Sequence, residues 1–193
     1  EVTGTYHLTK KLSPVANKIY NFGEFEPDYN YYVTKDGAGD KTGVTWSDAM
    51  SFSDMIAMLD NAKKDNNNNT LTAINGAVFN IAEGKYVLDD LFSFKYGSDD
   101  PIKFTFKGVE GKTSISGNNA HTIFDIYGNK DGKGSIEIIF EGLGFVESKS
   151  EWPAFYCQYS NSTTKFINCF ISDNVNDGAA GKGAGIAVMN GAN

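Results

Sequence analysis

The chain contains no arginine, and this absence narrows the range of its partners. All 17 basic residues are lysines, and the 193-residue chain has a formal net charge of −7. Nucleic-acid binding needs a basic surface, and base recognition often uses the bidentate guanidinium group. An acidic surface is also repelled by anionic membranes. We therefore expect neither nucleic acid nor an anionic membrane surface as a partner.

Cysteine and histidine are also scarce. The chain has two cysteines, Cys157 and Cys169, too few for the disulfide framework of a small secreted domain. They fall in different predicted strands, and we interpret both as small core residues. The two histidines, His7 and His121, are too few and too far apart in the sequence to indicate a metal or nucleophile site.

Long apolar runs are missing as well. No run approaches the roughly 18 apolar residues that a membrane-spanning helix needs, so we expect no membrane insertion. Hydrophobic residues nevertheless make up 40% of the chain and aromatic residues 13%. This composition is sufficient for the core of one folded domain.

Two strand motifs recur along the second half of the chain. The first begins at Phe106, Phe140 and Phe166, and the second, spaced by 31 residues, begins at Phe124, Phe155 and Ile186. Repeats of this length are typical of solenoids, in which each coil buries its apolar face against its neighbours. We expect each motif to form one inward ladder. In this alignment Cys169 occupies the same inward position as Val109 and Leu143.

Short apolar segments separated by Gly, Asn, Asp and Ser predict strands joined by sharp corners. We expect strands at residues 31–33, 77–81, 85–88, 102–109, 113–115, 122–127, 135–140, 145–147, 154–159, 165–171 and 185–189. Because no helices alternate with them, a doubly wound sheet is disfavoured and parallel coils stacked along an axis are favoured.

One amphipathic helix is predicted, over about residues 46–64. Its apolar face consists of Phe52, Met55, Ile56, Leu59 and Ala62, which recur at intervals of three and four residues. Thr45 and Asp48 are candidates for a capping box at its start. Since the first coil of a solenoid exposes its core unless an apolar element covers it, we expect this helix to act as a cap.

These features divide the chain into three parts. Residues 1–30 show no sustained periodicity and are interpreted as an extended leader. Residues 31–76 form an N-terminal cap that contains the helix, and residues 77–193 form the coils. The repeat stops in mid-pattern at Asn193, so we expect the coils to continue beyond it.

Two segments resemble known surface proteins. Residues 166–174, FINCFISDN, with residues 183–188, GAGIAV, resemble the FxNCxFxxN…GGAI repeat of polymorphic outer membrane proteins and of adhesin-like proteins of methanogenic archaea. The chain departs from that pattern at Ile171, where Phe is usual, and in the order Gly-Ala-Gly-Ile. Residues 31–62, followed by NIAEGKYVLDD at 80–90, resemble the N-terminal segment of many right-handed parallel β-helix surface proteins.

The resemblance implies an all-β fold, a right-handed parallel β-helix of the pectin-lyase-like type with an N-terminal amphipathic capping helix. It also implies a secreted protein or one displayed at the cell surface. Because this fold carries enzymes, adhesins and inert stalks alike, it leaves the activity open. We expect a non-catalytic adhesin or surface-display module that binds a cell-surface glycan or protein. The alternatives are a polysaccharide lyase or hydrolase and a structural stalk that associates end to end.

Aromatic residues are the best candidates for ligand contact. Alternate residues of a strand point to opposite faces, so tyrosines that alternate with inward residues must point outward. The candidates on this outer wall are Tyr127, Trp152, Tyr156 and Tyr159. Such a surface can stack against sugar rings or anchor a partner protein. A neighbouring loop that covers them is the alternative.

Acidic residues are weaker candidates, either as catalytic carboxylates or as metal ligands. The pairs Asp89–Asp90 and Asp99–Asp100 match no hydrolase motif that we recognise, and the lack of arginine removes a residue usual in lyases of this fold. The loop from Asp36 to Asp40 could hold Ca²⁺ with these two aspartates, although turn chemistry alone explains its composition. No other cofactor is indicated.

Two N-glycosylation sequons are present, beginning at Asn68 and Asn161. In an exported protein of a glycosylating organism they would mark exposed loops.

Overall fold

The computed structural model describes residues 29–64, 74–95, 101–128, 134–159, 161–178 and 183–192. Residues 1–28 of the expected leader and the sequon residue Asn68 lie outside this range, and so do Asp99 and Asp100.

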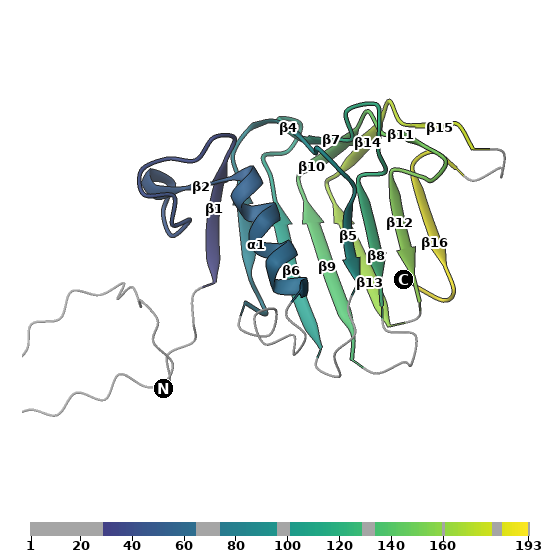
Figure 1. Cartoon of the computed structure of the whole chain (residues 1–193), viewed down its shortest axis with the longest axis horizontal. Coiled ribbons are helices and arrows are strands. Elements are labelled where there is room, and N and C mark those ends of the chain that lie inside the picture. Colours follow the sequence, from purple (N-terminus) through teal and green to yellow (C-terminus); the bar gives the residue numbers. More distant parts are fainter. Residues whose placement is uncertain are drawn as a thin grey trace, which may run out of the picture.

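Three parallel sheets surround one core (Figure 1). The first sheet has the order β13-β9-β6-β3-β1-β2, the second β14-β10-β7-β4 and the third β16-β12-β8-β5. The strands of the first sheet are β1 (Asn30–Thr34), β2 (Met50–Ser51), β3 (Val78–Ile81), β6 (Ile102–Lys107), β9 (Ile136–Glu141) and β13 (Ser162–Ile167). Those of the second are β4 (Gly84–Val87), β7 (Thr113–Ser116), β10 (Leu143–Val146) and β14 (Phe170–Ser172).

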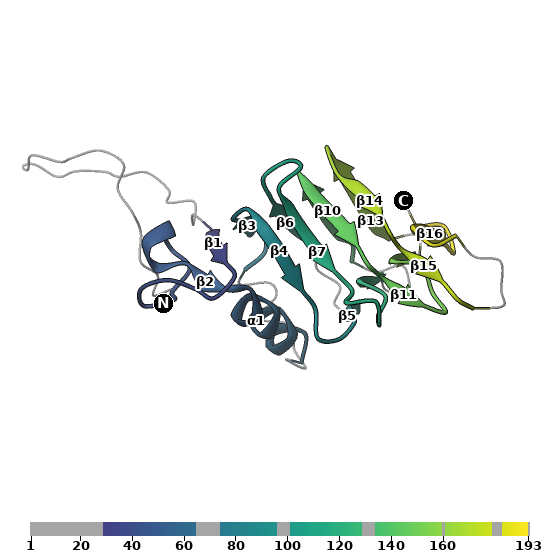
Figure 2. The same cartoon turned by 90° about the horizontal axis from the view of Figure 1, so that it is seen from above.

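The third sheet contains β5 (Phe92–Lys95), β8 (Phe124–Tyr127), β12 (Phe155–Gln158) and β16 (Ile186–Met189). A small two-stranded sheet pairs β11 (Lys149–Ser150) with β15 (Val175–Asn176). The chain visits the three main sheets in turn and then starts the next circuit, so that β4, β7, β10 and β14 lie side by side (Figure 2). The protein is therefore a parallel β-solenoid of about three turns, as the repeats predict.

The first predicted ladder is confirmed. Phe106 pairs with Phe140, and Phe140 pairs with Phe166, in one parallel register. Their rings stack, with centroids 5.4 Å and 5.7 Å apart. The stack continues to Phe79, whose ring is 5.2 Å from that of Phe106. Offset stacking of this kind stabilises a core beyond simple burial.

The second predicted ladder is also confirmed, and it begins one coil earlier than expected. Phe124 pairs with Phe155, which pairs with Ile186, and Phe92 of the unpredicted strand β5 precedes them. Ile186 is 40% exposed and Val188 53% exposed, because no described residue covers this side of β16.

The corners between the first and second sheets account for four of the eight residues by which the two spacings of the first motif differ. Five residues, 108–112, separate β6 from β7, whereas Gly142 alone separates β9 from β10. Leu143 consequently pairs with Thr113, and Val109 is exposed. The expected alignment of Val109 with Leu143 and Cys169 is therefore wrong for Val109. Cys169 is half-buried against the core.

The expected strand over 165–171 is two strands. It is interrupted at Asn168, whose φ of 51° turns the chain from β13 into β14. Asparagine tolerates this left-handed conformation better than most residues, and so it serves as a corner.

The helix begins later than predicted. Thr45 and Asp48 cap a short 3₁₀ helix, η1 (Trp46–Asp48), and the α-helix α1 spans Phe52–Lys64. The hydroxyl of Ser51 caps α1 by accepting a hydrogen bond of 3.0 Å from the backbone N–H of Asp54. Ser51 lies six residues after the predicted cap Thr45, and this later residue starts the α-helix.

The apolar face of α1 packs on the solenoid as expected. Phe52, Met55 and Leu59 are buried in the common core, and the ring of Phe52 lies 4.9 Å from that of Tyr86 in β4. Ile56 is half-buried at the edge of the same face. The helix thus lies alongside the first coil (Figures 1 and 2).

Candidate ligand-binding site

The predicted aromatic residues gather on the outer face of the third sheet. Phe124, Ile126, Phe155 and Cys157 point inward and are buried. The alternating positions therefore point outward. In the register of β8 and β12, Asp125 pairs with Tyr156 and Tyr127 pairs with Gln158.

The four aromatic side chains form one connected group, which we call the aromatic cluster: Tyr127, Trp152, Tyr156 and Tyr159. The ring centroid of Trp152 is 5.2 Å from that of Tyr156. Tyr127 lies 6.4 Å from Tyr156 and 5.9 Å from Tyr159. These separations fall within the range of favourable aromatic pairs.

Exposure differs strongly within the aromatic cluster. Trp152 is 44% exposed, whereas Tyr156 is only 7% exposed and forms the floor beneath its neighbours. The hydroxyl of Tyr156 lies 2.9 Å from the sulfur of Met189 in β16. Trp152 is thus the member that can offer the largest open face to a ligand.

A cavity of about 210 Å³ opens beside the aromatic cluster. Its lining residues are Leu91, Thr122, Asp125, Tyr127, Trp152 and Tyr156. Tyr159 contacts Tyr127 but does not line the cavity. Sequence reasoning missed Leu91, Thr122 and Asp125. The outward position of Asp125 between two inward residues of the motif was the signal that could have identified it.

Hydrogen bonds fix the backbone that carries Trp152. The hydroxyl of Ser150 accepts from the backbone N–H of Trp152 at 3.0 Å and donates to the carbonyl of the same residue at 2.8 Å. The same hydroxyl lies 2.8 Å from that of Thr122, on the cavity wall. The backbone at Trp152 is therefore fixed before any ligand arrives, which reduces part of the ordering cost of binding.

The charge of Asp125 acts on two tyrosines that line the cavity. Burial raises the pKa of Tyr127 above its ordinary value, and the charge of Asp125 raises it further. Burial and then the same charge also raise the pKa of Tyr156. Both phenols stay protonated at neutral pH and can donate hydrogen bonds.

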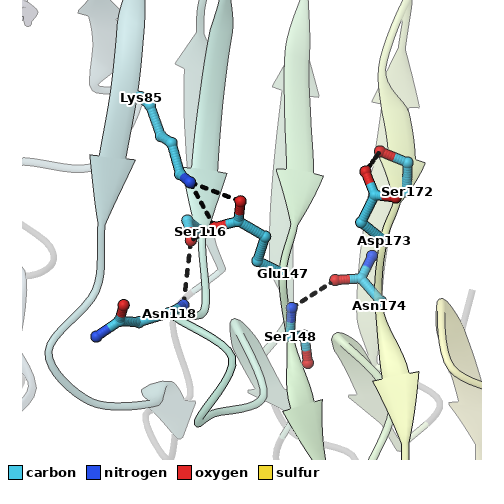
Figure 3. Close-up of polar contacts among 8 residues, drawn as sticks. All are labelled: Lys85, Ser116, Asn118, Glu147, Ser148, Ser172, Asp173 and Asn174. Carbon is cyan, nitrogen blue, oxygen red and sulfur yellow. Dashed lines mark hydrogen bonds and ion pairs between the residues drawn. The ribbon is translucent and has the colours of Figure 1, made fainter.

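A second polar group, which sequence reasoning did not identify, lies at the ends of the second sheet (Figure 3). The carboxylate of Glu147 accepts a hydrogen bond of 2.6 Å from the ammonium of Lys85 and one of 2.7 Å from the hydroxyl of Ser116. Farther along, the side chain of Asn174 accepts from the backbone N–H of Ser148 at 2.8 Å.

This polar group is suited to holding coils together. Hydrogen bonds from Lys85 and then Ser116 lower the pKa of Glu147 below its ordinary value. A carboxylate that stays ionised is a poor proton donor at neutral pH, and general acids need a raised pKa. Glu147 is therefore unsuited to act as a general acid at neutral pH.

The loop with Asp36 and Asp40 is tied to η1 by hydrogen bonds. The backbone N–H of Asp40 donates to the Asp48 carboxylate at 3.3 Å, and the hydroxyl of Thr45 donates to it at 3.0 Å. These bonds lower the pKa of Asp48. Among the described residues, no three His, Cys, Asp or Glu side chains gather as metal ligands would.

The sequon residue Asn161 is half-buried at a corner. Its side-chain amide donates to the carbonyl of Gly134 at 3.1 Å, and the next residue, Ser162, is fully buried. Glycosylation there would have to break this hydrogen bond.

Both cysteines are free thiols, as expected. Cys157 is buried in the core, and burial raises the pKa of Cys169. A raised pKa disfavours the nucleophilic thiolate.

Asp89 and Asp90 line a second cavity, of about 310 Å³, between α1 and the segment from β4 to β5. Asp60 of α1 joins them there, and Leu91 lines both cavities.

Comparisons of the chain with protein-family models, with curated proteins and with solved structures find no match. Within the described part of the chain, no helix has the length and apolar character needed to cross a bilayer. The fold defines the protein as a parallel β-solenoid.

Proposed function

We propose that this protein is a non-catalytic module of the right-handed, pectin-lyase-like type that works at the cell surface and binds glycans through its aromatic cluster. The observation that carries the proposal is the half-exposed Trp152 ring beside a cavity walled by Tyr127 and Tyr156. Aromatic faces stack on the apolar faces of sugar rings, while hydroxyl groups at the cavity edge hydrogen-bond to sugar hydroxyls.

The test is a glycan array probed with the wild-type chain and two tryptophan variants. Trp152→Ala removes the exposed wall of the cavity and is expected to lower the affinity for every bound glycan at least tenfold. Trp46→Ala is a matched control, because Trp46 is 49% exposed and contacts Tyr32 at the N-terminal end. Binding that survives Trp152→Ala, or a wild-type chain that binds no glycan, would contradict the proposal.

A polysaccharide-active enzyme is the second candidate, favoured by the cavity in which Asp60 joins Asp89 and Asp90. Glycoside hydrolysis uses two carboxyl groups on either side of the scissile bond. A polysaccharide-cleavage assay separates the two candidates. Turnover that Asp60→Asn or Asp89→Asn abolishes would replace the binding module with an enzyme.

A further inference from the structure

Two cavities on this side of the solenoid meet at Leu91. This residue lines the cavity of about 210 Å³ beside the aromatic cluster and also the cavity of about 310 Å³ beside α1. Its side chain is 37% exposed, and Trp152 in the first cavity and Val87 in the second are exposed to a similar extent. Exposed apolar side chains thus continue from Trp152 through Leu91 to Val87. Together the two cavities form one surface, which we call the extended groove.

The extended groove runs across the strands of the third sheet. Leu91, Thr122 and Trp152 lie shortly before β5, β8 and β12, which are neighbours in that sheet. Neighbouring strands are about 4.8 Å apart, so the part of the groove from Trp152 to Leu91 covers about 10 Å along the solenoid axis. The helix α1 lies on the side of β5 away from β8 (Figure 1), and the groove continues there past Val87. A ligand that fills the groove must therefore be long and lie along the axis.

A straight glycan chain meets this requirement. Pyranose rings joined by equatorial β-1,4 bonds form an extended chain, and the length of one unit is close to the spacing of about 4.8 Å between neighbouring strands. Successive sugars can therefore lie against successive coils. An α-1,4-linked chain coils, so its sugars cannot follow a straight groove. We propose, building on glycan binding as the proposed function, that the extended groove selects linear β-1,4-linked glycans several units long.

Each part of the extended groove supplies a contact for such a chain. The ring of Trp152 can stack on the apolar face of one sugar, and Leu91 and Val87 offer apolar contacts to the following rings. Asp89 and Asp90 line the cavity beside α1 and are exposed, and carboxylates accept hydrogen bonds from sugar hydroxyls. Neither cavity is much larger than about 300 Å³, the lower limit for pockets that enclose drug-sized ligands, so a chain of several sugars needs both.

Calorimetry with glycans of increasing length tests the proposal. The probes are neutral oligomers of two to six units, in four β-1,4-linked series built from glucose, xylose, mannose and N-acetylglucosamine. An α-1,4-linked glucose series is the comparison. In at least one β-1,4-linked series the six-unit member is expected to bind the wild-type chain at least tenfold more tightly than the two-unit member. The α-1,4-linked hexamer is expected to bind at least tenfold more weakly than the best β-1,4-linked hexamer.

The variant Ala57→Arg tests the part of the groove beside α1. Ala57 is exposed on α1 and lines this cavity but not the one beside the aromatic cluster, and arginine is a good helix former. Because the longer side chain would occupy the cavity, affinity for the six-unit oligomer should fall at least fivefold. Affinity for the two-unit oligomer, which can bind beside Trp152, should stay within about twofold. Val109→Arg, at an exposed residue of the corner 108–112, is the control. If Ala57→Arg fails to fold, the length series on the wild-type chain still decides the question.

The outcomes separate this inference from the proposed function. Equal affinity for two-unit and six-unit oligomers in every series, with binding abolished by Trp152→Ala, would overturn the extended groove and leave glycan binding intact. An α-1,4-linked hexamer that binds as tightly as the best β-1,4-linked one would overturn the selection for a straight chain, and so would binding to other glycans of the array but to none of these oligomers. Unchanged affinity of Ala57→Arg for the six-unit oligomer would overturn the part of the groove beside α1. A wild-type chain that binds no oligomer and no glycan of the array would overturn both proposals.

Discussion

The ammonium nitrogen of Lys85 lies 2.5 Å from Oε2 of Glu147, although the two residues are 62 positions apart in the sequence. Lys85 belongs to β4, Glu147 follows β10, and β7 lies between these strands in the second sheet. Ser116, the last residue of β7, donates to the same carboxylate. One side chain thus connects three successive coils.

Replacing Glu147 with Gln should lower the melting temperature slightly and in a salt-dependent way. The substitution removes the charge and keeps an acceptor for Ser116. At about 1 M salt the screening length falls to about 3 Å, so the difference from the wild type should narrow. Glu110→Gln, at an exposed corner, is the control. A difference that is the same in low and high salt would show that the ion pair is not its cause.

Low pH should destabilise the solenoid by protonating glutamates that form ion pairs with lysines. Hydrogen bonds from Lys165 and the charge of Lys103 lower the pKa of Glu137. A carboxyl whose folded-state pKa lies below its unfolded value stabilises the fold at neutral pH. This contribution is lost as the pH falls from the unfolded value of about 4.3 through the lower folded-state pKa.

Urea unfolding at a series of pH values from 7 to 3 tests this expectation. The urea concentration at the unfolding midpoint should fall as the pH is lowered into the acid range. This fall should be smaller in Glu137→Gln. An unchanged slope in Glu137→Gln would contradict a role for this glutamate.

Phe140→Ala should be among the most damaging substitutions. The ring is fully buried and contacts the rings of Phe106, Phe155 and Phe166. Removing it leaves a cavity at the centre of both ladders, with an expected loss of about 3 to 5 kcal/mol in unfolding free energy. Val109→Ala, at an exposed apolar residue, should change stability by less than about 0.5 kcal/mol. Comparable losses for the two variants would contradict the core assignment.

Two capping substitutions can separate the α-helix from η1. Ser51→Ala removes the cap of α1 and should cost about 1 kcal/mol of unfolding free energy. Thr45→Ala removes the cap of η1, a single short turn that buries no residue, and should cost less. Chemical denaturation of both variants provides the comparison. A larger loss for Thr45→Ala would favour the sequence-based helix start at residue 46.

The regular part of this fold could be predicted because corners of different length compensate one another and leave the strands of the third sheet evenly spaced. Phe124, Phe155 and Ile186 are separated by 31 residues each, so one alignment places all three in a single column. The corner at 108–112 is four residues longer than its counterpart at Gly142, so an alignment that starts from Phe106 wrongly places Val109 in the core. A repeat shows which positions recur. It does not show how many residues each corner contains.

The candidate site was predictable only in part. Strand alternation correctly placed Tyr127 and Tyr156 on the outer face. It could not show that Tyr156 is buried by its neighbours or that Asp125 shares a cavity with them. The contact between Lys85 and Glu147 could not be predicted either, because it joins a side chain of β4 to one that follows β10, two strands away in the sheet.

The direction of the hydrogen bonds between coils has a mechanical consequence. In a stack of parallel coils these bonds point along the long axis, so a pulling force applied at the two ends loads them in series. Coils detach one after another under such a load, each at the force that its own contacts resist. The bridge from Lys85 to Glu147 joins coils that are not adjacent, and it therefore shares the load across the interfaces on both sides of β7.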